Sequence, residues 1–186
     1  MIILASKSPR RIELMKKISP EFKIISPSFD ERTLLNSSKH LALKEAKNKA
    51  ISVKNIAKPE DFLITCDTTV VFEDRVFNKP ADIEDAFNTL KFLSGKTHQV
   101  ITGYTISHGN KEILREVITD VTFNVLSDEL IRRYINEINV LDKAGSYAIQ
   151  DDENYHLISK IKGSYSNVIG FPIDEIKSDL ESLGAF

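Results

Sequence analysis

The first residues of the chain change from an apolar run to a helical repeat of apolar and polar positions. Residues 2–5 have the sequence IILA, a short apolar stretch typical of a buried strand. Ser8 and Pro9 are residue types preferred at the N-cap and at the first position of a helix. The sequence therefore predicts a strand, a turn and a helix. The side chains that this helix turns toward a core are Ile12, Met15 and Ile18.

The same two patterns alternate through the middle of the chain. Residues 22–26 are predicted as a second strand, and apolar residues at helical spacing predict a helix from Ser38 to Val53. Residues 62–73, which are apolar and rich in β-branched side chains, predict a long extended run. Asp82 is suited to cap a further helix, and Gly95 is suited to end it.

The remaining residues predict a long hairpin followed by helices and one more strand. β-Branched residues dominate both arms of residues 97–125, and residues 109–110 (GN) supply a turn between them. Ser127 opens another amphipathic helix, residues 155–163 are predicted as a strand, and residues 172–183 as a closing helix. Hairpins and crossovers together predict an α/β fold with a mixed sheet.

Length and composition agree with one ordinary globular protein. A chain of 186 residues suits one domain over residues 1–186, and its contents of 41% hydrophobic and 28% charged residues are usual. A net charge of −2 argues against a basic surface for bulk binding of nucleic acid. The lone Cys66 allows no intramolecular disulfide, and no long apolar run predicts export or membrane insertion. We therefore predict a cytoplasmic protein with no membrane partner.

The turn after the first strand collects groups that bind anions. Ser6 and Ser8 precede Arg10 and Arg11, which the predicted helix places in its first turn. The helix dipole disfavours cations there by a few tenths of a kcal/mol up to about 1 kcal/mol, so an anion is expected to offset this cost. Strand, turn and helix N-terminus form a phosphate site. An ordinary capped helix with solvated arginines fits the same residues.

An acid interrupts the apolar run LITCDTTVV. Burying the ionised carboxylate of Asp67 without a partner is costly, so Asp67 needs a metal, a cation or a water, unless it makes a turn hydrogen bond at a strand end. Together with Asp30, Glu31, Lys49 and Lys79, it can form a metal-assisted phosphate site. The neighbouring thiol of Cys66 is interpreted as an inert core residue.

Five segments in order resemble the signatures of the Maf family. They are SKSPRR (6–11), CDTTVVFEDRVFNKP (66–80), LSGKTHQVITG (93–103), DKAGSYAIQ (142–150) and IKGSYSNVIGFPI (161–173). The resemblance implies an elongated mixed β-sheet flanked by helices, with two lobes around a nucleotide cleft, similar to inosine triphosphate pyrophosphatases. It implies a homodimer that hydrolyses nucleoside triphosphates to a monophosphate and pyrophosphate.

The resemblance also assigns roles to individual residues. Asp67 matches the catalytic acid, which positions or deprotonates a water, and Lys79 matches a lysine that stabilises pyrophosphate. Lys49 matches a lysine of an Ala-rich helix, with Lys44 and Lys47 as alternatives. The phosphate-binding turn matches Ser6, Ser8, Arg10 and Arg11.

A divalent cation, Mg²⁺ or Mn²⁺, is implied as the cofactor. Glu31 matches the acid that contacts this metal, with Asp30 as its rival. Two residues depart from the family pattern, since Asn78 and Ala148 stand where glycine is usual.

The substrate is narrowed by three positions that resemble the branch of the family acting on dTTP and UTP. These are Arg10, Thr68 and Gln150. The amide of Gln150 offers a donor and an acceptor for the O4 and N3–H edge of uracil or thymine. Modified pyrimidine triphosphates are expected substrates as well, which suggests removal of unwanted nucleotides. The alternatives are a pyrophosphatase for 7-methyl-GTP or another modified nucleotide, and a non-enzymatic regulator that binds nucleic acid or a division partner.

Overall fold

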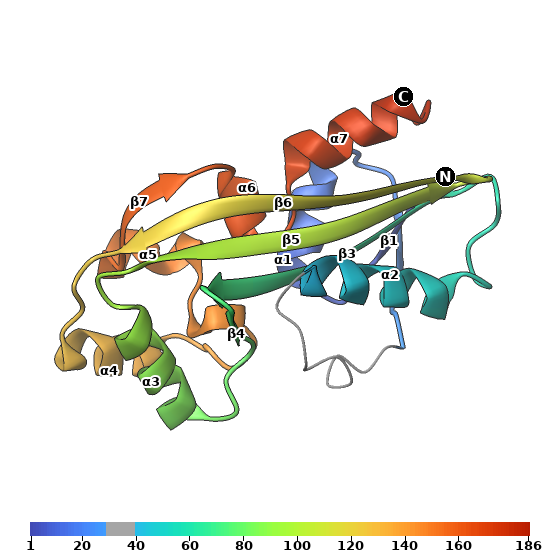
Figure 1. Ribbon diagram of the computed structural model, residues 1–186. Coiled ribbons are helices and arrows are strands. Elements are labelled where there is room, and N and C mark those ends of the chain that lie inside the picture. The colour runs from blue at the N-terminus through green and yellow to red at the C-terminus, as the bar shows by residue number, and fades with distance from the viewer. Residues whose placement is uncertain (29–39) are drawn as a thin grey trace. The chain divides into compact units, whose positions relative to one another are not determined.

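The computed structural model describes residues 1–28 and 40–186 and contains the predicted mixture of helices and strands (Figure 1). Its strands are β1 (Ile2–Ala5), β2 (Lys23–Ile25), β3 (Phe62–Phe72), β4 (Arg75–Phe77), β5 (Thr97–His108), β6 (Lys111–Phe123) and β7 (Ile158–Lys162). Its α-helices are α1 (Pro9–Lys16), α2 (Leu41–Val53), α3 (Ile83–Leu93), α4 (Asp128–Glu137), α5 (Asp152–Tyr155), α6 (Tyr165–Ile169) and α7 (Ile173–Ser182). The 3₁₀ turns η2 (Ala144–Ser146) and η3 (Ile149–Asp151) follow α4.

The seven strands form one mixed sheet, as predicted. Hydrogen-bonded neighbours follow the order β2-β1-β3-β5-β6-β7, and β4 pairs with β3. Strand β1 runs parallel to both β2 and β3, whereas β4 is antiparallel to β3 and β7 is antiparallel to β6. The α/β class with a mixed sheet is therefore confirmed.

The chain divides into two compact units. The first consists of Met1–Thr68, Thr102–Val117 and Gly170–Phe186, and the second of Thr69–Ile101 and Ile118–Ile169. The prediction of a single domain over residues 1–186 stays a prediction.

In the first unit, helix α2 packs against strand β5 at Gly103. A Cβ atom added to Gly103 would lie 2.2 Å from the backbone nitrogen of Leu43 and 2.4 Å from its Cα. Such a separation is far inside van der Waals contact, so this crossing of helix and strand requires glycine. A small core on the same unit contains Ile3, Ala5, Ile25, Val53 and Leu63. Helix α2 is therefore held at both its first and its last turn.

The second unit has an apolar core of its own, and helices α3 and α4 contact each other there (Figure 1). The two helices begin at the caps that the sequence predicts. The side chain of Asp82 accepts a hydrogen bond from the backbone nitrogen of Asp85, and that of Ser127 accepts one from Leu130. Each bond satisfies one of the donors that a helix N-terminus leaves open.

The structure differs from the predicted elements mainly in the short ones. Strand β4 and helices α5 and α6 are absent from the prediction, because three to five residues are too few to show a period. Helix α1 ends at Lys16, so Ile18 lies beyond it and is only half-buried. In the described ranges, 1–28 and 40–186, no helix has the length and apolar character needed to cross a membrane.

His98 is buried in the core of the second unit. Its ring is 1% exposed, packs edge-on against Phe123 and Tyr147, and places Nε2 2.7 Å from the hydroxyl oxygen of Tyr147. Burial lowers the pKa of His98 to about 4 from an ordinary 6.5, because the imidazolium form loses its hydration.

We expect this histidine to make folding stability depend on pH. As the pH is lowered below about 6.5, this histidine takes up a proton in the unfolded chain, whereas in the folded protein it stays neutral down to about pH 4. The free energy of unfolding therefore decreases as the pH is lowered from about 6.5 to about 4. The full effect is about 3 kcal/mol, at about 1.4 kcal/mol per pH unit. Urea unfolding at pH 7 and pH 5 should show about 2 kcal/mol of it, since pH 5 lies about 1.5 units below the ordinary pKa. His98→Gln should lose this part of the pH dependence, and an equal slope in both proteins would contradict the assignment.

Candidate functional site

The turn between β1 and α1 has the predicted arrangement. Ser8 is the N-cap of α1 and Pro9 its first residue, so Arg10 and Arg11 lie in the first turn. The side chain of Ser8 makes no cap hydrogen bond, whereas the backbone nitrogen of Ser8 donates to Oγ of Ser6 at 3.1 Å. No residue in the first turn of α1 is acidic. The positive end of the α1 dipole therefore keeps both arginines beside it without a carboxylate from the same turn.

Arg11 is not a solvated surface cation. Its guanidinium donates from Nε to the carbonyl of Gly170 at 2.9 Å and from Nη1 to the carbonyl of Cys66 at 2.9 Å. A third bond runs from Nη2 to the hydroxyl of Thr68 at 3.1 Å. The arginine thereby joins α1, the middle of β3 and the segment before α7. Arg11 thus orients the chain on both sides of Asp67.

The hydroxyl of Thr68 occupies a close-packed position within this arrangement. It lies 3.0 Å from the hydroxyl of Thr102, and a Cβ on Gly170 would lie 3.0 Å from it. Gly170 has φ +107°, a backbone conformation that residues with a Cβ atom rarely adopt. Both its conformation and its contact with Thr68 therefore favour glycine.

Asp67 forms a buried ion pair with Lys49 of α2. Nζ of Lys49 donates to Oδ1 of Asp67, and the two residues are 5% and 7% exposed. Lys44 and Lys47 on the same helix are exposed. Of the three candidate lysines, the structure thus brings Lys49 to Asp67. Among the partners that the sequence leaves open, the described residues supply a cation.

A further carboxyl group at this site was missing from the prediction. Glu45 is 6% exposed and forms a side-chain hydrogen bond with Asp67. It lies one helical turn before Lys49, so both side chains lie on the same face of α2. The buried face of this helix consists of Leu41, Ala42, Glu45, Ala46, Lys49, Ala50 and Val53. Two charged residues within an otherwise apolar stripe are the signal that could have identified Glu45.

These contacts set the charge of Asp67. Burial alone would raise its pKa, but the hydrogen bond from Glu45, the charges of Lys49 and Arg11 and the hydrogen bond from Lys49 together lower the pKa below its ordinary value. Asp67 is therefore a carboxylate at neutral pH. Burial raises the pKa of the adjacent Cys66 thiol, which agrees with its interpretation as an inert core residue.

The remaining predicted residues belong to the second unit or lie outside the described residues. Lys79, which follows β4, and Gln150, which lies in η3, belong to the second unit, and both are exposed. The carbonyl of Asn78 there accepts a hydrogen bond from the nitrogen of Gly145 at 3.3 Å. Asp30 and Glu31 lie outside the described residues. Within residues 1–28 and 40–186, no group of three His, Cys, Asp or Glu side chains is placed to hold a metal ion.

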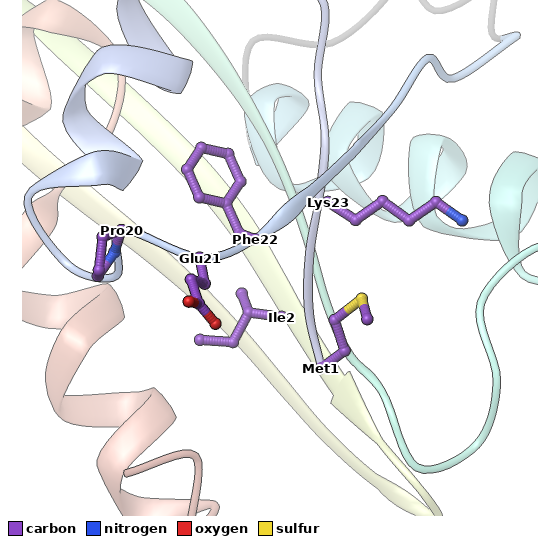
Figure 2. Close-up of a pocket in the computed structure, with 6 residues that line it drawn as sticks. All are labelled: Met1, Ile2, Pro20, Glu21, Phe22 and Lys23. Atoms are coloured by element: carbon purple, nitrogen blue, oxygen red, sulfur yellow. The ribbon is translucent and has the colours of Figure 1, made fainter.

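A hollow of about 710 Å³ opens near the start of β1 (Figure 2). It is lined by Met1, Ile2, Pro20, Glu21, Phe22 and Lys23, none of which is a predicted site residue. Since β1 and β3 are parallel, this hollow lies at the beginning of β1, whereas Ser6 and Asp67 come after paired residues Ala5 and Thr65 at the other end. The hollow is therefore not part of the site around Asp67.

The sequence of this chain is similar to those of known proteins over nearly its whole length. The sequence model of a family described as "Maf-like protein" matches residues 1–183. A protein of Thermosipho africanus named "dTTP/UTP pyrophosphatase" is 45% identical over 175 residues, which cover 94% of this chain and 89% of that protein. A protein of the same name from Thermococcus onnurineus is 40% identical over 184 residues, covering 99% and 98%. The resemblance seen in the sequence is confirmed.

The fold also occurs among solved structures. The "Structure of a HAM1 protein from Coxiella burnetii" has a TM-score of 0.53 at 12% sequence identity and covers 97% of this chain and 98% of its own. At this identity the likeness concerns the fold alone, and it agrees with the α/β class.

The buried ion pair leads to a prediction about stability. Lys49→Met would leave the Asp67 carboxylate buried without its ammonium partner, and we expect a loss of about 3–5 kcal/mol at pH 7. Lys47→Met, at an exposed position of the same helix, is the matched control and should change stability by about 0.5 kcal/mol or less. Urea unfolding of the three proteins measures both effects.

The loss should depend on pH in a defined direction. Because the pKa of folded Asp67 is lowered, its ionised form stabilises the protein above the ordinary carboxyl pKa, and this contribution disappears as the pH falls through the folded value. The difference between Lys49→Met and the unchanged protein should therefore shrink in acid. Equal effects of the two lysine substitutions at pH 7 would contradict the role given to Lys49.

Proposed function

This chain belongs to the Maf family, and on that premise we propose that it is a nucleoside triphosphate pyrophosphatase that hydrolyses dTTP and UTP. The observation that carries the proposal is the buried Asp67 carboxylate, which is held by Lys49 and lies one residue before Thr68 and beside the Arg11 guanidinium. Relatives aligned over nearly the whole chain have names that state this activity. We propose a role in removing unwanted pyrimidine nucleotides.

The proposed reaction is attack of water at the α-phosphate, which releases pyrophosphate and a nucleoside monophosphate. Asp67 is ionised at neutral pH, so its carboxylate can accept a hydrogen bond from the attacking water and orient it. The leaving pyrophosphate carries growing negative charge, which fixed cations stabilise. We assign this stabilisation to Arg11 and Lys49, with backbone and hydroxyl donors from the turn containing Ser6, Ser8 and Arg10.

Two residues of the second unit complete the proposal by family resemblance. Lys79 is assigned to the pyrophosphate, and Gln150 to the edge of the base. Both side chains are exposed, so neither is buried in the core of its own unit. The two residues that replace the usual glycines lie close by in the sequence: Asn78 directly precedes Lys79, and Ala148 lies two residues before Gln150.

We also propose that a divalent cation, Mg²⁺ or Mn²⁺, is required. By the family resemblance Glu31, or its rival Asp30, would hold it, and carboxylate oxygens are the donors that a hard cation prefers. When bound, such an ion would supply positive charge that stabilises the negative charge of the phosphates. A cytoplasmic location and a homodimer, without a nucleic-acid partner, complete the proposal and rest on the sequence.

Product analysis tests the reaction itself. With dTTP and Mg²⁺, we expect dTMP and pyrophosphate in equal amounts, measured directly by chromatography, and loss of turnover when a chelator is added. Asp67→Asn keeps the shape of the side chain but removes its charge, so turnover should fall by about a hundredfold or more while the nucleotide still binds. Titration calorimetry of the unchanged protein and of Asp67→Asn, at the same protein and nucleotide concentrations, measures that binding.

Three outcomes would each overturn a separate part of this assignment. Diphosphate and orthophosphate as first products would mean that the γ-phosphate is removed instead. Normal turnover by Asp67→Asn would remove this residue from the reaction, whereas activity in the presence of chelator would remove only the metal.

Substrate choice is tested by comparing kcat/KM for dTTP, UTP, CTP, GTP and 7-methyl-GTP. We expect dTTP and UTP to be preferred, because the amide of Gln150 matches the donor and acceptor of uracil and thymine while cytosine presents the reverse pattern. The triphosphate of 5-methyluridine should react, since a site that accepts both bases tolerates the methyl group. Gln150→Leu should lower the ratio of kcat/KM for dTTP to kcat/KM for CTP. Expressed as a free energy, this loss of discrimination should exceed the change in the free energy of unfolding. Preference for either guanine nucleotide would favour the alternative branch of the family.

A further inference from the structure

A buried hydroxyl group joins helix α2 to the sheet close to the ion pair of the site. Oγ1 of Thr65, in β3, donates to the carbonyl of Ala46 in α2 at 2.6 Å and lies 2.8 Å from Oγ1 of Thr105 in β5. All three residues are 0% exposed and belong to the first unit, and the proposed reaction uses none of them. The helix is therefore tied to two strands where water cannot replace these bonds.

The direction of each hydrogen bond follows from the number of protons. A hydroxyl has one proton and a carbonyl can only accept, so the proton of Thr65 lies on its bond to Ala46. The bond between the two hydroxyl groups is then donated by Thr105. A carbonyl oxygen has two lone pairs, so Ala46 can accept from Thr65 in addition to the helical amide four residues later. The donors therefore run in one direction, from β5 through β3 to the helix.

These bonds lie between the same helix and the same strand as the ion pair. Thr65 and Asp67 are two residues apart, which places both side chains on one face of β3. Ala46 and Lys49 are three residues apart, which places both on the buried face of α2. The bond from Thr65 to Ala46 thus determines where along β3 the helix lies. It thereby determines where the ammonium of Lys49 meets Asp67.

The contact at Gly103 alone does not determine this position. Gly103 lies two residues before Thr105, on the same face of β5, and it gives room to the backbone of Leu43. This contact limits how closely α2 approaches the sheet, but van der Waals contact does not select one place along a strand. A hydrogen bond weakens steeply when it is misaligned, so the bond from Thr65 to Ala46 does select one.

We propose that Thr65 is a positioning residue for the ion pair between Lys49 and Asp67, because its hydroxyl holds α2 at the place where both charged groups face the reaction. The effect of Thr65 on turnover rests on the proposed function, whereas its effect on the ion pair does not. The groups of the turn after β1 belong to other elements, so loss of the Thr65 hydroxyl should reduce turnover more than nucleotide binding.

The effect on the ion pair is measured by urea unfolding, without any substrate. Thr65→Val keeps the shape of the side chain and removes its hydroxyl, whereas Thr65→Ser keeps the hydroxyl. Lys49→Met should reduce the free energy of unfolding equally in the unchanged protein and in Thr65→Ser. In Thr65→Val the same substitution should cause about half of that reduction or less, because groups that act together are not additive. An equal reduction in all three proteins would overturn the proposal.

A second measurement decides if the doubly substituted protein does not fold. Carbon-13 NMR of the Asp67 carboxyl group, assigned with Asp67→Asn, should show its pKa about half a unit or more higher in Thr65→Val than in the unchanged protein, because its cation is held less well. An unmoved pKa would overturn the proposal. Neither measurement needs a nucleotide, so failure of the proposed function is distinguishable from failure of this inference.

Steady-state kinetics with dTTP test the effect of Thr65 on the reaction. In Thr65→Val, kcat should fall about tenfold while KM changes by less than about twofold, and Thr65→Ser should restore most of the lost kcat. Thr105→Val is the matched control, because it removes a buried hydroxyl of the same size but leaves the bond from Thr65 to Ala46. Its kcat should fall by about twofold at most. An equal fall in both valine variants would overturn the role of Thr65, and so would a rise in KM as large as the fall in kcat.

Discussion

The cost of keeping one ionised carboxylate inside an apolar strand determines how this region is built. Asp67 interrupts β3 between buried neighbours, and water cannot solvate it there. The protein meets this cost with the ammonium of Lys49, the guanidinium of Arg11 and a hydrogen bond from Glu45. All three come from helices that pack on the sheet. The position of each helix is therefore tied to the charge on a single side chain.

Geometry enforces this link between helices and charge. The contact of Gly103 with the backbone of Leu43 sets the depth of α2, and hence the position of the buried side chains farther along the helix. Arg11 does the same for α1, because its three hydrogen bonds end on carbonyl and hydroxyl groups around Asp67. Rigid placement of charged groups is what electrostatic stabilisation of a reaction requires, since the groups then need no reorganisation.

Local chemistry in the sequence was enough to predict the long elements and part of the site. Ser8 with Pro9, Asp82 and Ser127 mark helix starts that the structure retains, and the apolar runs mark the strands. The sequence analysis placed Asp67 and Lys49 in one candidate site but did not predict that they pair, because residues 18 apart are brought together by packing and not by periodicity. Glu45 was missed because a single acid on a helix is usually solvated. The acceptors of Arg11 could not be predicted at all, since two of them are backbone carbonyls.

The reach of Arg11 along the chain has a consequence for synthesis. Its bond to Gly170 spans 159 residues, whereas its bond to Cys66 spans 55. At about 5–20 residues per second, a ribosome needs roughly 8–30 s to reach Gly170 after it has added Arg11. A nascent chain of 68 residues already holds Glu45, Lys49 and Asp67, yet the first unit still lacks Thr102–Val117 and Gly170–Phe186. The arginine clamp therefore closes only after the second unit, Thr69–Ile101 and Ile118–Ile169, has been synthesised.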